Sequence, residues 1–178
     1  MTIRTRATLG ALFAVSLLFA AGGCGRGVST AEAVRFNDTL VGLNARLAQA
    51  GKEFGEAAVK AVDGDLIEIA KAKRAFEKLT ETMDGVKSES KGLKVPDSAS
   101  ARRLHEEFRR MLQAQEQMVK DDLGDVLRLL EDPQQTSAER RKKIAPIGSY
   151  LEAIDTKVLA GVRKAQAAFA GEYGFKLK

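Results

Sequence analysis

The sequence predicts an all-α protein: an antiparallel, up-down-up-down four-helix bundle that follows an N-terminal signal peptide. The composition favours helix, because Ala, Leu, Glu, Lys and Arg are abundant and only three prolines occur in 178 residues. Apolar residues recur in steps of three and four along four long segments. Short turns separate these segments, and none alternates apolar and polar residues as a half-buried strand would.

The first 23 residues are typical of a removable signal peptide. Arg4 and Arg6 supply positive charge, an uncharged stretch follows, and small residues lead into Cys24. The alternatives are a plain secretory signal with a stray cysteine, or an uncleaved transmembrane anchor. The anchor is disfavoured because the stretch is barely long enough to span a bilayer and is interrupted by polar and small residues.

The run from Ala20 to Cys24 resembles the lipobox of bacterial lipoproteins. Gly22 and Gly23 match its small positions, whereas Ala21 stands where Leu is usual. The resemblance implies diacylglyceryl transfer to the Cys24 sulfur, cleavage between Gly23 and Cys24, and acylation of the new amine. Two or more acyl chains anchor a protein stably to a membrane, so the lipid is a covalent anchor rather than a cofactor.

Residues 24–28 are then a lipidated tether, and residues 29–178 form one folded domain. Gly25 rather than Asp follows Cys24. By analogy with envelope sorting, this favours the outer membrane over the inner one, with the domain facing the periplasm. Residues 24–178 carry 27 basic and 24 acidic side chains, a net charge of +3 that does not indicate nucleic-acid binding.

The first helix is expected over residues 30–61. Ser29 followed by Glu32 has the spacing of a capping box. Steps of three and four alternate along the apolar series, which is typical of left-handed helix packing. The series consists of Phe36, Leu40, Leu43, Leu47, Ala50, Phe54, Ala57 and Ala61.

The second helix is expected over residues 66–91. Asp65 with Glu68 indicates a second cap, and Gly92 indicates the helix end. Pro96 then predicts a turn. The series consists of Ile69, Ala72, Phe76, Leu79, Met83, Val86, Ser90 and Leu93.

The third helix is expected over residues 98–131, ending at Asp132-Pro133. Its series consists of Leu104, Phe108, Leu112, Gln115, Val119, Leu123, Val126 and Leu130. Gln115 is a polar residue at a core position. Such a residue either sets the register of the helices, the commoner reason, or lines a ligand pocket.

The fourth helix is expected over residues 137–171, with Thr136 and Glu139 as another capping box. Pro146 predicts either a kink or a later start. Phe175 and Leu177 are expected to fold back onto the domain. Its series consists of Ile144, Ile147, Leu151, Ile154, Val158, Val162, Ala165 and Phe169.

Glycines occur within both the first and the fourth helix, which are neighbours in such a bundle. They lower helix propensity, and they either permit close contact between the two helices or open a pocket. The sequence leaves both possibilities open. These glycines are Gly42, Gly51, Gly55, Gly148 and Gly161.

The sequence indicates no catalytic or metal site. His105 is the only histidine, so neither a multi-histidine metal motif nor a nucleophile with a separate histidine base is available, and a solvated position is expected. The acidic residues of the third helix are expected to form ion pairs with neighbouring Arg and Lys on a solvated face. The basic run 140–143 is likewise interpreted as a solvated first turn, with attraction to anionic lipid as the alternative.

These features predict a monomeric, non-catalytic envelope lipoprotein whose bundle binds a partner protein or supports an envelope complex. One alternative is a bundle that senses a small molecule or stress, with the ligand held between helices. Another is a periplasmic holdase chaperone, although regular apolar series favour a closed core.

Overall fold

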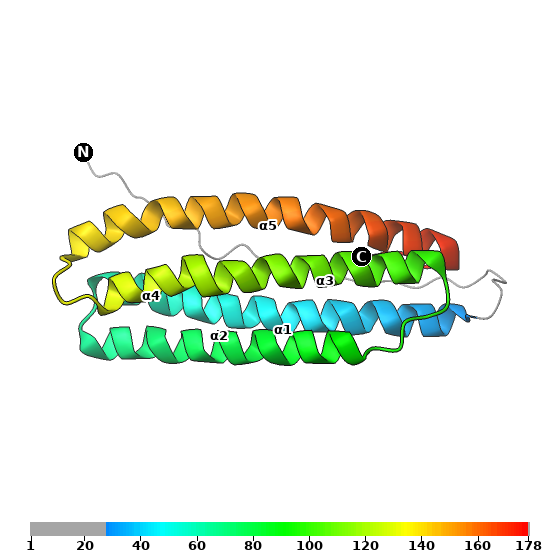
Figure 1. Ribbon diagram of the computed structural model, residues 1–178, viewed down its shortest axis with the longest axis horizontal. Coiled ribbons are helices and arrows are strands. Elements are labelled where there is room, and N and C mark those ends of the chain that lie inside the picture. The colour runs from blue at the N-terminus through cyan, green and yellow to red at the C-terminus, as the bar shows by residue number, and fades with distance from the viewer. Residues whose placement is uncertain (1–27, 178) are drawn as a thin grey trace.

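The computed structural model describes residues 28–177, and every element within this range is helical (Figure 1). The observed bounds lie within two residues of the expected ones. The signal peptide, Gly23, Cys24 and the tether through residue 27 lie outside the described residues. The elements are α1 (Thr30–Asp63), α2 (Leu66–Gly92), α3 (Ala99–Met118), the π-helical segment η1 (Val119–Leu123), α4 (Gly124–Glu131) and α5 (Ser137–Tyr173).

The helices lie lengthwise beside one another in an elongated body (Figure 1). α1 packs against α2, and α3 packs against α5. α3, η1 and α4 follow one another along one line, since the backbone stays helical at Val119 and at Gly124. Within residues 28–177, no helix combines the length and apolarity that a membrane span requires.

Side-chain caps define the helix starts. Both expected capping boxes form, at Ser29 with Glu32 and at Thr136 with Glu139. In each capping box, a hydrogen bond from the backbone N–H of the cap residue lowers the pKa of the glutamate. Asp65 caps α2 by accepting bonds from two backbone N–H groups.

The third helix departs from the expected continuous α-helix, because η1 interrupts it. Gln115, Val119 and Leu123 follow one another in steps of four, and such steps drift around the axis of a helix with 3.6 residues per turn. The wider turn of a π-helix offsets this drift. Val119, which begins the wide turn, and Val126, which follows it, are both buried.

Pro146 lies inside α5, so the expectation of a later helix start is wrong. Proline has no N–H to donate to the carbonyl four residues earlier, on Lys142. Lys142 is exposed, and water can therefore bond that carbonyl.

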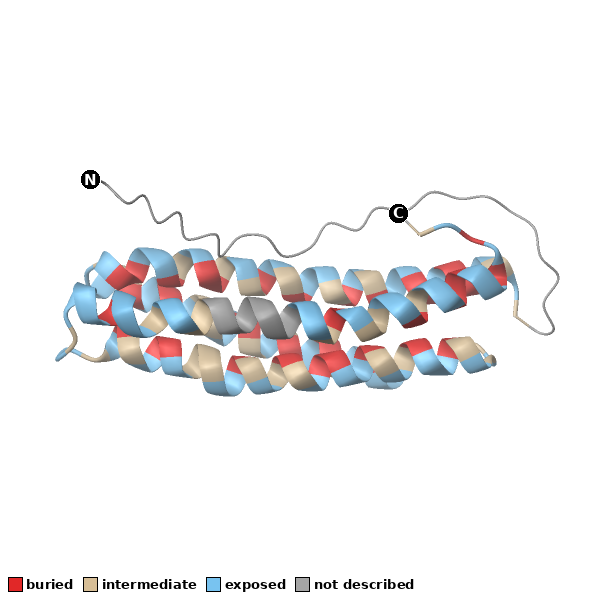
Figure 2. Ribbon diagram, turned by 90° about the horizontal axis from the view of Figure 1, so that it is seen from above, coloured by how far each residue is buried: buried red, intermediate tan, exposed pale blue. Residues whose placement is uncertain are grey.

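Buried residues recur along the helices (Figure 2). Their apolar side chains join in one core. Phe54, Phe108 and Phe169 are the largest fully buried side chains. As expected, Phe175 folds back, and its ring centroid lies 5.8 Å from that of Phe169. Its N–H donates to the carbonyl of Ala170, and Gly174 makes this turn with a φ of 69°.

Not all glycines of α1 are needed for close contact between helices. A Cβ added at Gly42 or Gly51 would meet no atom within 4 Å. We therefore expect Gly42→Ala and Gly51→Ala each to raise the free energy of unfolding by about 0.5–1 kcal/mol, because alanine loses less backbone entropy in a helix. Urea denaturation measures this gain.

Gly161→Ala on α5 is the matched control. Its Cβ would lie 2.9 Å from a carboxylate oxygen of Glu107, so it must displace that side chain and gain less. Equal gains at Gly42, Gly51 and Gly161 would contradict this account.

Candidate functional site

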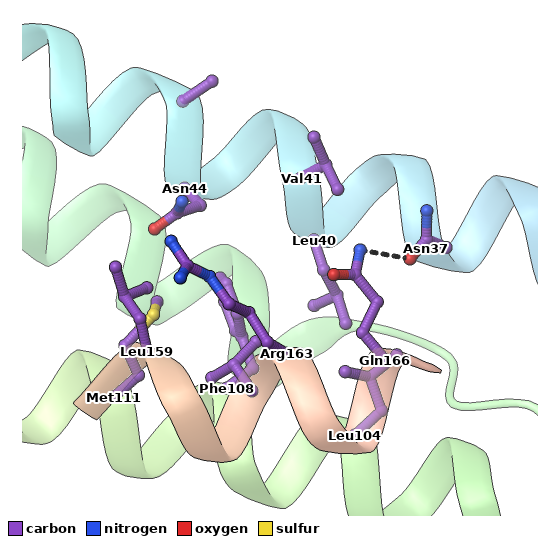
Figure 3. Close-up of a pocket in the computed structure, with 12 residues that line it drawn as sticks. Asn37, Leu40, Val41, Asn44, Leu104, Phe108, Met111, Leu159, Arg163 and Gln166 are labelled. Atoms are coloured by element: carbon purple, nitrogen blue, oxygen red, sulfur yellow. Dashed lines mark hydrogen bonds between the residues drawn. The ribbon is translucent and has the colours of Figure 1, made fainter. Parts of the chain in front are cut away.

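A cavity of about 220 Å³ lies between α1, α3 and α5 (Figure 3). Each helix contributes side chains three or four residues apart, which lie on one face of that helix. α1 contributes Asn37, Leu40, Val41, Asn44 and Ala45, α3 contributes Leu104, Phe108 and Met111, and α5 contributes Leu159, Val162, Arg163 and Gln166.

The inner wall of the cavity is apolar and firmly packed. Leu104, Phe108 and Met111 on α3 are each 1% exposed, and Leu40 and Leu159 are also buried. These side chains form part of the continuous core of the domain. The wall is therefore suited to contact with an apolar ligand. Its position is fixed by the packing that holds the domain together.

One group of polar atoms in the cavity is paired across α1 and α5. Asn37 is fully buried, and its Oδ1 accepts a 2.7 Å hydrogen bond from Nε2 of Gln166 (Figure 3). Because a buried amide without a partner is costly, this bond stabilises the contact between the two helices.

A second polar group has no such partner. Oδ1 of Asn44 is buried, and no described donor lies within hydrogen-bonding distance. Arg163 is exposed and extends toward Asn44 in Figure 3, and it has no ion-pair partner among the described residues. The cavity thus combines an apolar wall with an unpaired cation and an unsatisfied acceptor.

The lining residues supply binding groups. They include two asparagines, a glutamine and an arginine, but no histidine, cysteine or carboxylate. Across the described residues, no three His, Cys, Asp or Glu side chains gather closely enough to hold a metal ion. The arrangement is suited to holding a small molecule by apolar contact and by bonds to its polar end.

Gln115, the polar core residue singled out in the sequence, lies on α3 one turn beyond Met111. It is buried, as its place in the apolar series predicts, but it does not line this cavity.

The expectation that His105 is solvated is wrong. The ring is half-buried, with Nε2 2.8 Å from the carbonyl oxygen of Ser90, and it meets Phe36 edge to face at 6.3 Å. Ser90 lies in the last turn of α2, where carbonyls lack partners within the helix. His105 thus joins α3 to the end of α2.

The basic run is also not uniformly solvated, because Arg140 is buried and donates to the carbonyl of Asp132 at 3.1 Å. Arg141, Lys142 and Lys143 are exposed, as expected.

Two of the acidic residues of α3 form ion pairs. Glu107 pairs with Arg110, and Glu116 pairs both with Lys120 and with Lys87 on α2. Hydrogen bonds from Lys120 and Lys87 lower the pKa of Glu116. The sequence predicts the pairs with Arg110 and Lys120 along the third helical segment, but it does not predict the bond from Lys87 on α2.

Comparison with protein-family models, with curated proteins and with solved structures finds no match to this chain.

Proposed function

We propose that this chain is a monomeric, lipid-anchored and non-catalytic module of the bacterial cell envelope. Cys24 carries the lipid in this proposal, and the domain faces the periplasm, from the outer membrane rather than the inner one. The observation that carries the proposal is the run of small residues ending in the sole cysteine, which α1 follows closely. Only residues 25–29 separate Cys24 from the first helical residue, Thr30.

We further propose an antiparallel, up-down-up-down four-helix bundle, in which α3, η1 and α4 count as one rod. Short connections at 64–65, 93–98 and 132–136 support this arrangement, because short loops favour antiparallel neighbours. A 3.3 Å hydrogen bond from Oγ1 of Thr30 to the carbonyl of Tyr173 supports placing the start of α1 beside the end of α5.

In this arrangement the length of the bundle separates its far end from the anchor. α1 has 34 residues, which corresponds to a length of about 50 Å at 1.5 Å per residue. The end opposite the anchor carries the turn at 64–65 and the loop at 132–136. It therefore stands well clear of the membrane surface, where it can bind a partner protein.

A holdase receives less support. A holdase needs a broad apolar surface, whereas the large apolar side chains exposed among the described residues are Val59, Leu66 and Ile67. A small-molecule role is favoured by the cavity between α1, α3 and α5.

The anchor is tested by Cys24→Ala, which removes the sulfur that would carry the lipid. We expect the variant to move from the membrane fraction to the soluble fraction and to lose incorporation of labelled palmitate, because an unlipidated domain has no acyl chain to insert. Fractionation and labelling in a bacterial host measure both effects.

Gly27→Ala serves as the matched control, since it alters the tether and leaves the lipobox intact. Unchanged membrane association and labelling of Cys24→Ala would overturn the proposal. In-cell crosslinking of the anchored protein then tests the partner role, for which one stoichiometric partner is expected. Absence of a specific partner would contradict that role.

A further inference from the structure

We propose that the cavity between α1, α3 and α5 binds a small amphiphilic carboxylic acid whose apolar body contains about eight carbons, as a short acyl chain or a substituted aromatic ring. The acid's apolar body lies against the inner wall, and its carboxylate meets Arg163 at the rim. This function goes beyond anchoring and partner binding, and it does not depend on either.

The size of the cavity sets the size of the ligand. Its volume is about 220 Å³. An apolar cavity of ~150 Å³ accepts benzene, with six heavy atoms. The present cavity therefore accommodates roughly nine heavy atoms, which excludes a full-length membrane lipid.

The wall determines the character of the ligand body. Phe108 and Met111 face the cavity from α3, opposite Leu40 of α1. A thioether and an aromatic ring adapt to both aliphatic and aromatic partners. The wall thus favours an apolar ligand body but does not determine whether that body is aliphatic or aromatic.

The rim determines the charge of the ligand. Arg163 has no carboxylate partner among the described residues, in contrast to Arg46, which pairs with Glu89 at 2.6 Å. A guanidinium binds a carboxylate through two parallel N–H bonds. Since no lining residue is acidic, the site favours an anion over a cation.

Asn44 provides a second unpaired group that a bound carboxylate would help to satisfy through Arg163. A guanidinium has five N–H donors, so Arg163 can hold a carboxylate with two of them and still donate another to Oδ1 of Asn44. The buried acceptor of Asn44 then gains the partner that it lacks. In this way the ligand pairs with Arg163, and the arginine so oriented pairs with Asn44.

The test uses the full chain carrying Cys24→Ala, because neither an acyl chain nor detergent then competes for the cavity. Octanoate is the probe, and 1-octanol is its uncharged counterpart of equal chain length. Calorimetry is expected to show one octanoate per chain, bound more tightly than 1-octanol. The methyl NMR signal of Met111 is expected to shift on binding, which localises the ligand.

Arg163→Gln is expected to weaken octanoate binding about tenfold and to leave 1-octanol binding unchanged. Lys164→Gln is the matched control, since it removes the same charge from the next, exposed residue, which does not line the cavity. Val162→Phe, which fills the cavity, is expected to abolish binding of both probes.

Three results would overturn the proposal: no octanoate-dependent shift of the Met111 signal, equal weakening by Arg163→Gln and Lys164→Gln, or undiminished binding by a folded Val162→Phe variant. Circular dichroism establishes that the variant is folded. Arg163→Gln alters an exposed side chain, so it tests the site even where Val162→Phe does not fold.

Discussion

Replacing Phe169 with alanine is expected to lower the free energy of unfolding by about 3–5 kcal/mol. The side chain of Phe169 is fully buried. Its ring centroid lies 5.7 Å from that of Phe36, 5.0 Å from that of Tyr173 and 5.8 Å from that of Phe175. Truncation removes all three ring contacts and leaves a cavity between α1 and the end of α5. Urea denaturation followed by circular dichroism measures the loss.

Val59→Ala is the control, because Val59 lies on the same domain but is 45% exposed. Its effect is expected to remain within about 0.5 kcal/mol. A loss of less than about 1 kcal/mol for Phe169→Ala would show that this end of α5 opens separately from the rest of the domain, and that the aromatic cluster lies outside the cooperative core.

The starts of the helices follow from signals that span a single turn. Ser29 and Glu32 satisfy each other's backbone groups, as do Thr136 and Glu139, and both partners of each box lie within four residues. No distant contact is needed for such a cap. For this reason the starts of α1 and α5 can be predicted from the sequence alone.

The π-helical segment depends on more than local spacing. Leu104, Phe108 and Leu112 also follow in steps of four, yet they lie in regular α-helix. The widening at η1 therefore depends on how the third helix meets the packed core around it, which spacing in one helix does not reveal.

The sequence fails to predict the burial of His105 and of Arg140 for a shared physical reason. Each meets a backbone carbonyl near a helix end, that of Ser90 for His105 and that of Asp132 for Arg140. Every residue other than proline carries the same backbone groups, so the sequence does not mark which carbonyl lacks a partner at a given place in the fold.

The cavity left a partial signal in the sequence. Asn37 and Asn44 lie seven residues apart, which places both on one face of α1, and asparagine is a poor helix former. Arg163 and Gln166 gave no comparable signal, since polar residues at such spacing are ordinary on a helix surface. Only the packing of three helices reveals where these side chains leave space between them.

Replacing Gln166 with methionine is expected to lower the free energy of unfolding by about 1–3 kcal/mol. Methionine has nearly the shape of glutamine but no donor, so Oδ1 of Asn37 loses its 2.7 Å bond. Asn37 is fully buried, and water cannot readily replace the lost donor. Denaturation in urea, compared with the unaltered chain, measures the loss.

Asn37→Leu and the double variant complete the test. Asn37→Leu is expected to cost less than Gln166→Met, because Gln166 is only half-buried and water can bond its amide. The double variant is expected to recover most of the loss, since neither of these two positions then retains a buried amide that has lost its partner. Additive losses in the double variant would show that the two amides act independently. Recovery would instead show that the polar contact between α1 and α5 is kept for a reason other than stability, and ligand binding in the cavity that both residues line is such a reason.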